Sequence, residues 1–288
     1  MKKLLSRLGI FLFILLLFNI AFSYIVWKAY YREYSAVALN FDTYLLADSR
    51  GEPIEDFLKG IGVYNFSQGS DSYHDMLRKL KYLAKNTRVK RIIITVDDHT
   101  LSRFREGLNN LDRSIIYAFP EDFDSKFEYY KIRYIKRYIV FFNSKSRDIL
   151  KTRIKIEIPD GKNNDHTEEW GSLNQEKRLE LAKERIEYHF AFKEKSKQMS
   201  RALDEIMSFC HTNDIELIGI KFPLSNDYYN LIKERGYKAD SLIKDSGYTV
   251  MDFTTLYVNN DDYFFNQDHL NKEGGKAFAD TLIRYLTY

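Results

Sequence analysis

Short apolar segments alternate with helical ones along most of this chain, and this alternation restricts the fold more than any other feature. The apolar runs lie at 41–46, 60–66, 91–96, 215–222 and 248–253. Continuous runs of this length are typical of parallel strands that are covered on both faces. Because helical segments separate the strands, the pattern predicts a doubly wound α/β domain with a parallel sheet.

The predicted helices carry apolar residues at helical spacing. They include 71–86, 228–234 and an amphipathic C-terminal helix at 272–288. Residues from about 100 to 210 interrupt the alternation, and we predict a helical insertion there between the third and fourth core strands. Its last part, from Ser172 to about Cys210, is expected to form one long charged helix.

The N-terminal stretch 8–27 holds no charged residue over 20 positions, which is the length that a helix needs to cross the apolar core of a bilayer. Lys2, Lys3 and Arg7 come before it, and aromatic residues gather at its far end, as they do at membrane interfaces. We therefore predict one transmembrane helix in the inner (cytoplasmic) membrane, with the basic N-terminus in the cytoplasm.

A cleavable signal sequence is the alternative, because Ala21-Phe22-Ser23 resembles a cleavage site. The apolar stretch continues past this site to Trp27, which favours an uncleaved signal-anchor helix. The predicted organisation is a cytoplasmic segment 1–7, a transmembrane helix 8–27, a juxtamembrane linker 28–40 and an extracytoplasmic, periplasmic domain 41–288.

Charge and cysteine content exclude several classes of function. The net charge of +3 equals that of the three basic N-terminal residues, and the remainder balances 41 basic against 41 acidic residues. A nucleic-acid partner needs a basic face, so we expect none. Cys210 is the single cysteine, which excludes an internal disulfide, and we expect it to be buried in a helix. Gly60-Ile61-Gly62 lacks the third glycine of a dinucleotide fingerprint, and we expect no cofactor and no metal.

The segment 123–150 is predicted to be a helix with an unusual distribution of side chains. The aromatic residues on one side are Phe127, Tyr130, Tyr134, Tyr138, Phe141 and Phe142, and basic residues surround the other side. The favoured interpretation is an ordinary amphipathic helix packed on the domain. The alternative is a helix that rests on the membrane surface or covers the site as a lid.

Polar residues after the first and last strands suit nucleophilic catalysis. Ser49 lies in the turn after the first strand, and Pro53 suits the first turn of a helix directly after it. A serine at this edge faces the crevice where open α/β sheets bind ligands, although a serine that only caps a helix has the same sequence context. His269 follows the last strand, so we expect it at the same edge, where it can take a proton from the Ser49 hydroxyl.

The chain resembles the SGNH/GDSL hydrolase superfamily over about residues 41–288. The matching blocks are Ala47-Asp48-Ser49, Asn65-Phe66-Ser67-Gln68-Gly69, and His269-Leu270-Asn271 with Gly274. More narrowly, it resembles membrane-anchored cell-envelope members, namely alginate and peptidoglycan O-acetyltransferase-like proteins and the lipoteichoic acid D-alanylation protein. The resemblance implies a three-layer α/β/α, flavodoxin-like fold. It also implies that Ser49 is the nucleophile, that His269 is the base, and that the N–H groups of Ser49 and Gly69 hold the oxyanion.

Three positions depart from the family pattern. Ala47 replaces the first glycine, which is a mild change. The third block normally offers an asparagine that donates to the oxyanion, whereas the strand here ends in Asp97 and Asp98, and ionised carboxylates cannot donate. Asn266 stands where the family has the aspartate that orients His269, so it can orient the imidazole but cannot stabilise its charge. The residues that could supply this charge are Asp268, Asp262 and Asp97.

Two functions from different classes follow. The first is an extracytoplasmic serine esterase or acyltransferase that acts on acyl groups of envelope glycans or glycolipids, with a multi-pass membrane acyltransferase as a candidate partner. The second is a catalytically degenerate module of the same fold that binds an envelope polymer or such an acyltransferase. A metal site built from Asp97, Asp98, His99 and His269 is least favoured, because its ligands would come from two loops without a helix-spaced pair.

Overall fold

The structure is a computed structural model that describes residues 2–287 apart from 147, 150–168 and 233–234. By their internal contacts the residues divide into two compact units. The first consists of Met1–Ala36 with Leu111–Asn164, and the second of Val37–Asn110 with Asp165–Tyr288. The predicted insertion at about 100–210 is therefore shared between the two units.

The second unit is built on a five-stranded sheet in which all neighbouring strands are parallel. Its strands are β1 (Thr43–Leu46), β2 (Val63–Asn65), β3 (Arg91–Thr95), β4 (Glu216–Lys221) and β5 (Thr249–Asp252). They lie in the order β2-β1-β3-β4-β5, which is the flavodoxin-like order. The predicted parallel α/β fold is thus confirmed. Such sheets bind ligands at the switch point of the strand order, beyond the carboxyl ends of β1 and β3.

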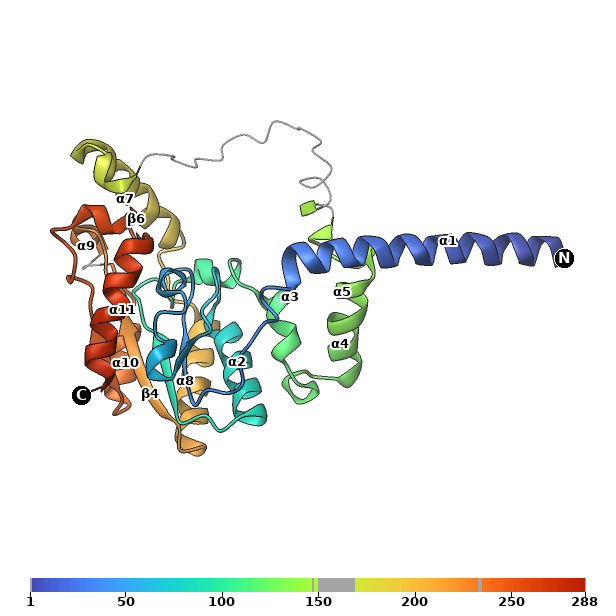
Figure 1. The fold of residues 1–288 in the computed structure, drawn as a ribbon, viewed down its shortest axis with the longest axis horizontal. Coiled ribbons are helices and arrows are strands. Elements are labelled where there is room, and N and C mark those ends of the chain that lie inside the picture. The colour runs from blue at the N-terminus through green and yellow to red at the C-terminus, as the bar shows by residue number, and fades with distance from the viewer. Residues whose placement is uncertain (1, 147, 150–168, 233–234, 288) are drawn as a thin grey trace. The chain divides into compact units, whose positions relative to one another are not determined.

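Buried side chains cover both faces of this sheet. On one face, Leu45, Ile93 and Ile218 share a buried cluster with Phe278 of α11 (Lys272–Thr287). The alternate strand residues point to the opposite face and are equally buried. There α2 (Tyr73–Asn86) and α8 (Lys197–Thr212) pack against each other, and the Tyr73 hydroxyl donates to the carbonyl of Thr95 at 3.0 Å. The result is a three-layer α/β/α arrangement (Figure 1).

The remaining elements of this unit frame the sheet. α7 (Gln175–His189) packs on α9 (Asn226–Ile232), and α10 (Ala239–Asp245) contacts both β4 and β5. A short antiparallel pair, β6 (Phe264–Asn266) with β7 (His269–Leu270), precedes α11.

The long charged helix predicted from Ser172 to about Cys210 is wrong, because the chain forms two helices there. Asn174 caps α7, since its side chain accepts the N–H of Lys177. The chain then turns, and Ser196 caps α8 by accepting the N–H of Met199. Cys210 is buried in α8 as predicted, and burial raises the pKa of its thiol to about 12.

In the first unit, α1 (Lys2–Val26) continues into a π-helical turn, Trp27–Tyr31. By length and composition this helix is able to cross a membrane, which is the part of the anchor prediction that the structure supports. The chain just after this turn is held by the segment that follows α3 (Leu111–Ser114), because the Tyr117 hydroxyl donates to the carbonyl of Tyr34 at 2.5 Å.

The predicted helix at 123–150 is divided in the part that the structure describes, and positions 147 and 150 lie outside the described residues. It consists of α4 (Lys126–Tyr130), a π-helical turn (Lys131–Ile135) and α5 (Lys136–Tyr138), followed by a 3₁₀ turn at Val140–Phe142. The favoured interpretation, in which its aromatic stripe packs on the domain, is wrong because most of those side chains are exposed.

Candidate active site

The turn after β1 presents Ser49 at the carboxyl edge of the sheet. The Gly51 N–H donates to the Asp48 carbonyl at 3.0 Å, and the Asn65 side chain donates to the Gly51 carbonyl at 2.8 Å. A Cβ at position 51 would lie 2.7 Å from Cβ of Ser67 and 2.9 Å from Cβ of Ala47, so only glycine fits between the ends of β1 and β2.

The helix expected after Ser49 is only a 3₁₀ turn, Glu52–Ile54. Gly51 occupies the N-cap position of this turn, and a glycine has no side chain to cap it. The serine hydroxyl is engaged elsewhere, so the alternative in which Ser49 caps a helix is wrong. A turn of this length also brings little helix dipole to the site.

The Ser49 hydroxyl lies 2.7 Å from Nε2 of His269. The two residues are 220 positions apart in the chain, and they meet where the turn after β1 lies beside His269, the first residue of β7. This distance is within the reach that a general base needs for direct proton transfer. The predicted nucleophile and base are therefore in hydrogen-bonding contact.

Two side chains orient the His269 ring from its other nitrogen. Nδ1 lies 2.9 Å from Oδ1 of Asn266 and 3.1 Å from Oδ1 of Asp268. The Asn266 oxygen also accepts the backbone N–H groups of Asp268 and His269, which fixes the amide with its oxygen toward the ring. Because both partners of Nδ1 are acceptors, the proton of neutral His269 resides on Nδ1, and Nε2 is free to accept from Ser49.

Asp268 is the carboxylate that stands beside the imidazole. It is buried and lies 3.0 Å from Nη2 of Arg50 and 3.3 Å from Nε of Arg185. Burial acts to raise the pKa of Asp268, but His269, Arg185 and Arg50 outweigh it and hold that pKa well below its usual value. An ionised carboxylate therefore replaces the charge that Asn266 lacks.

The predicted oxyanion donor Gly69 is occupied in this structure. Its N–H donates to Oε1 of Glu52 at 2.7 Å, and the Gln68 amide donates to the same oxygen at 3.2 Å. The next residue, Ser70, lines the pocket beside Ser49 and has a left-handed backbone with φ of 70°. Gly69 can donate to an oxyanion only after the Glu52 carboxylate moves away.

The two aspartates at the third-block position are paired with basic residues. Asp97 is buried, lies 3.2 Å from Nη1 of Arg50 and accepts the N–H of Phe222. Burial raises its pKa. Asp98 lies 2.9 Å from Nζ of Lys221 in a separate pocket. The residues of the suggested metal site are thus engaged in separate interactions, and no group of three potential metal ligands occurs in the described part of the chain.

The pocket holds two buried histidines, of which the sequence analysis considered His99 only as a metal ligand and missed His189. The rings of His99 and His189 stack with centroids 4.6 Å apart, and His99 Nε2 lies 3.0 Å from Oδ2 of Asp48. His99 directly follows the third-block aspartates, whereas His189 is the last residue of α7. Nδ1 of His189 lies 2.7 Å from the Tyr228 hydroxyl.

Both histidines are neutral near pH 7. Burial lowers the pKa of His99 to about 3, and it also lowers the pKa of His189 well below its usual value. Burial acts to raise the pKa of Asp48, but the hydrogen bond from His99 and nearby positive charges outweigh it and lower that pKa. Neutral His99 therefore donates from Nε2 to ionised Asp48.

These residues enclose a pocket of about 250 Å³ at the switch point of the sheet. It is lined by Asp48, Ser49, Arg50, Ser70, His99, Phe104, Arg105, Leu108, Arg185, Tyr188, His189, Asp268 and His269. The lining is mostly polar and charged, with arginines beside aspartates. Such a pocket suits a small, polar group in front of Ser49.

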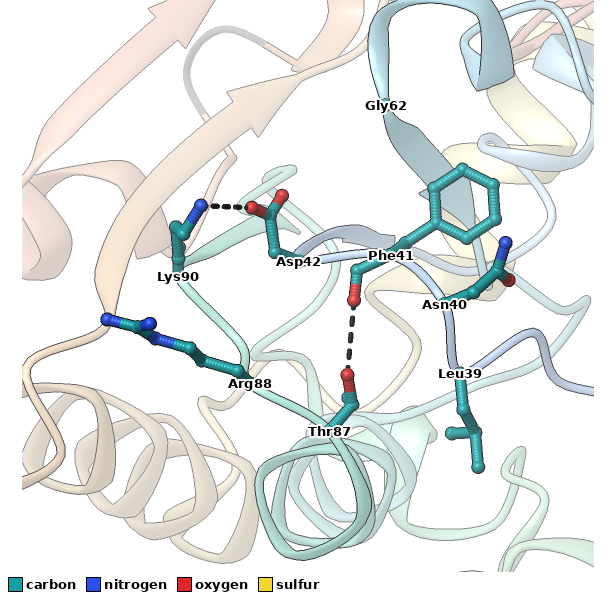
Figure 2. A pocket seen from close by; sticks show the side chains of 8 residues that line it. All are labelled: Leu39, Asn40, Phe41, Asp42, Gly62, Thr87, Arg88 and Lys90. Atoms are coloured by element: carbon teal, nitrogen blue, oxygen red, sulfur yellow. Dashed lines mark hydrogen bonds and ion pairs between the residues drawn. The ribbon is translucent and has the colours of Figure 1, made fainter.

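A larger hollow of about 520 Å³ lies at the opposite, amino end of the strands (Figure 2). There Lys90 Nζ lies 2.5 Å from Oδ2 of Asp42, and the Thr87 hydroxyl donates to the Phe41 carbonyl at 3.3 Å. These contacts join the segments that enter β1 and β3, and the eight lining residues include no histidine, serine or cysteine. We assign this hollow a structural role.

Comparisons with known proteins are sparse. No protein-family model matches the chain, and no curated protein matches it. Among solved structures, a GDSL-like lipase from Bacteroides thetaiotaomicron is similar at a TM-score of 0.42 and 10% identity, over 91% of this chain and 98% of that one. A protein assigned to the lipolytic G-D-S-L family from Desulfitobacterium hafniense has a TM-score of 0.41 and 14% identity, over 84% and 98% of the two chains. We base the fold on the strand order and register of the sheet.

Proposed function

We propose that this protein is a membrane-anchored, extracytoplasmic serine esterase or acyltransferase of the SGNH type. The observation that carries the proposal is the 2.7 Å contact between the Ser49 hydroxyl and His269, whose other ring nitrogen faces an ionised carboxylate. Ser49, His269 and Asp268 are thus connected as nucleophile, base and orienting group, which is the arrangement that nucleophilic catalysis requires.

Each step then has a residue to perform it. Ser49 Oγ attacks the carbonyl carbon of an ester while its proton passes to Nε2 of His269, and Asp268 stabilises the imidazolium that forms. Collapse of the tetrahedral intermediate breaks the ester bond, and His269 returns the proton to the leaving alkoxide. Water or a sugar hydroxyl then attacks the acyl-serine through the same base, which releases the acid or a new ester.

The predicted anchor and the pocket together suggest the substrate. α1 is suited to hold the protein on a membrane, and the basic N-terminus favours a domain outside the cytoplasm. A polar pocket of about 250 Å³ suits a short acyl group on a polar alcohol. We therefore propose acylated envelope glycans or glycolipids as substrates, with a multi-pass membrane acyltransferase as a candidate source of acyl groups.

Labelling with a fluorophosphonate tests the nucleophile. The full-length protein in membranes should form a covalent adduct near neutral pH, and Ser49→Ala should abolish it. Ser67→Ala is the matched control, because Ser67 lies at the end of the neighbouring strand and should leave labelling intact. Absence of a Ser49-dependent adduct in the folded protein would refute the proposal.

A non-catalytic binding module remains the second candidate, because Glu52 occupies the Gly69 amide and no asparagine follows β3. In that case Ser49→Ala should leave binding to an acylated envelope polymer unchanged, and the wild-type protein should release no acid from it.

A further inference from the structure

The exposed side of the segment from α4 to the turn at Phe142 is aromatic. We name this surface the aromatic face, and it comprises Phe127, Tyr130, Tyr134, Tyr138, Phe141 and Phe142. Phe127, Phe141 and Phe142 are 73%, 78% and 63% exposed. The rings of Tyr130, Tyr134 and Tyr138 stack in sequence, with centroids 5.9 Å and 6.5 Å apart. An exposed apolar surface of this kind marks an interaction site.

The end of this segment is attached to α1 within its apolar stretch. Asn19 and Ser23 both donate to the carbonyl of Tyr138, at 3.0 Å and 2.5 Å, and the Val140 N–H donates to Oδ1 of Asn19 at 3.0 Å. Trp27 ends the charge-free stretch, and Asn19 lies eight residues before it. This separation corresponds to about 12 Å along the helix. The apolar half of a bilayer is about 15 Å thick, so this contact lies at the depth of lipid tails.

These hydrogen bonds explain why polar side chains stand inside an apolar helix. The helix α5 ends at Tyr138, where a carbonyl loses its intrahelical partner. A backbone group at membrane depth needs a partner within the protein, because lipid offers none. Asn19 supplies both a donor and an acceptor at this point.

The orientation and charges of the segment fit the outer leaflet of a bilayer. Figure 1 shows α4 and α5 running crosswise to α1, so they lie in the membrane plane when α1 spans it. Lys126, Lys131 and Lys136 are exposed beside the aromatic rings, and their long side chains can extend from there toward anionic lipid headgroups. Arg137, in contrast, is buried, with its guanidinium 4.3 Å from the centre of the Tyr31 ring.

We propose that the aromatic face is immersed in the outer leaflet of the same bilayer that α1 spans. The first unit then holds the membrane by a spanning helix and by a second segment that lies within that leaflet. This inference rests on the anchoring part of the proposed function but not on catalysis.

Nitroxide labels on the full-length protein in phosphatidylcholine–phosphatidylglycerol vesicles test this inference. Single cysteines would replace Phe141, Tyr134, Leu12 in α1, or the exposed Asp204 in α8, while the native Cys210 is buried. Labels at Phe141 and Tyr134 should collide with oxygen severalfold more often than with a water-soluble nickel chelate. The label at Asp204 should show the reverse preference.

The outcomes separate the two proposals. If the Phe141 label behaves like the Asp204 label while the Leu12 label is immersed in lipid, the immersion of the aromatic face is refuted and the anchor stands. Protection of the Phe141 label from both reagents would mean that protein covers the face, which also refutes the inference. A water-accessible Leu12 label would refute the anchor, and the inference with it.

Discussion

At the residue scale, Nδ1 of His269 has two acceptors, and in the proposed mechanism they have different tasks. Asn266 fixes the ring through a short local loop, and Asp268 brings the negative charge. Because Asp268 also pairs with Arg50 and Arg185, its charge would serve both the proposed catalysis and the stability of the fold.

The first prediction separates these two tasks. Asp268→Asn should lower kcat for ester hydrolysis by roughly 10³–10⁴-fold, since the imidazolium loses its counter-charge. The double variant Asp268→Asn/Asn266→Asp should recover part of this loss, because the charge returns to the other acceptor of Nδ1. Steady-state kinetics of the folded proteins check it, and no recovery in the double variant would argue against a charge role for Asp268.

Glu52 gives a second prediction. Its carboxylate accepts the Gly69 N–H that the proposed reaction would use as an oxyanion donor. Glu52→Ala should therefore raise kcat by roughly tenfold or more, given that one oxyanion donor contributes about 10²–10³ in kcat. Asp56→Ala, an exposed carboxylate just beyond the same turn, should leave kcat unchanged. An equal or lower kcat in the Glu52 variant would exclude Gly69 as an oxyanion donor.

At the scale of elements, α7 supplies one side of the pocket and a turn in the chain separates it from α8. The last part of α7 carries Arg185 beside Asp268 and His189 beside His99. Ser196 starts α8 by capping it, and its hydroxyl also donates to Oε1 of Glu106 at 2.6 Å.

The third prediction concerns this cap. Ser196→Ala should lower the free energy of unfolding by about 1 kcal/mol, because the N–H of Met199 loses its acceptor. Ser200→Ala, one turn inside the same helix, should cost less, since its hydroxyl bonds only to the carbonyl of Ser196. Chemical denaturation in detergent measures both, and equal losses would contradict the capping role.

At the scale of the whole molecule, the buried histidines make stability depend on pH. His99 and His189 remain neutral in the folded state below the usual pKa of 6.5, whereas in the unfolded chain they take up protons there. The unfolded state thus binds more protons, and the free energy of unfolding should fall as pH falls from about 6.5 toward 3. Asp71, whose pKa burial raises to about 6, acts in the opposite sense.

A variant isolates the histidine contribution. His189→Gln should reduce the slope of unfolding free energy against pH by about 1.4 kcal/mol per pH unit in this range, which corresponds to one proton. The exposed His211→Gln should leave the slope close to wild type. Thermal or chemical unfolding across the range checks it, and an unchanged slope for His189→Gln would mean that this histidine is protonated in the folded state.

The sequence alone determined the parallel sheet, the apolar N-terminal helix, and Ser49 and His269 as the residues to test. Strand periodicity and a charge-free stretch are local signals, so they survive in a single chain without tertiary information. The polar residues at strand ends also follow from the topology, because the carboxyl ends of parallel strands meet at one edge.

Only the tertiary structure decided which groups surround these two residues. Side-chain contacts place Asp268, and not Asp262 or Asp97, beside the imidazole of His269. They also bring Glu52 to the Gly69 amide and His189 to His99. The exposure of the aromatic face was likewise not predicted, since an amphipathic pattern does not state what covers it. Contacts such as that of Glu52 with Gly69 and that of His99 with His189 arise from side-chain packing, and sequence patterns within a few turns of chain carry no record of them.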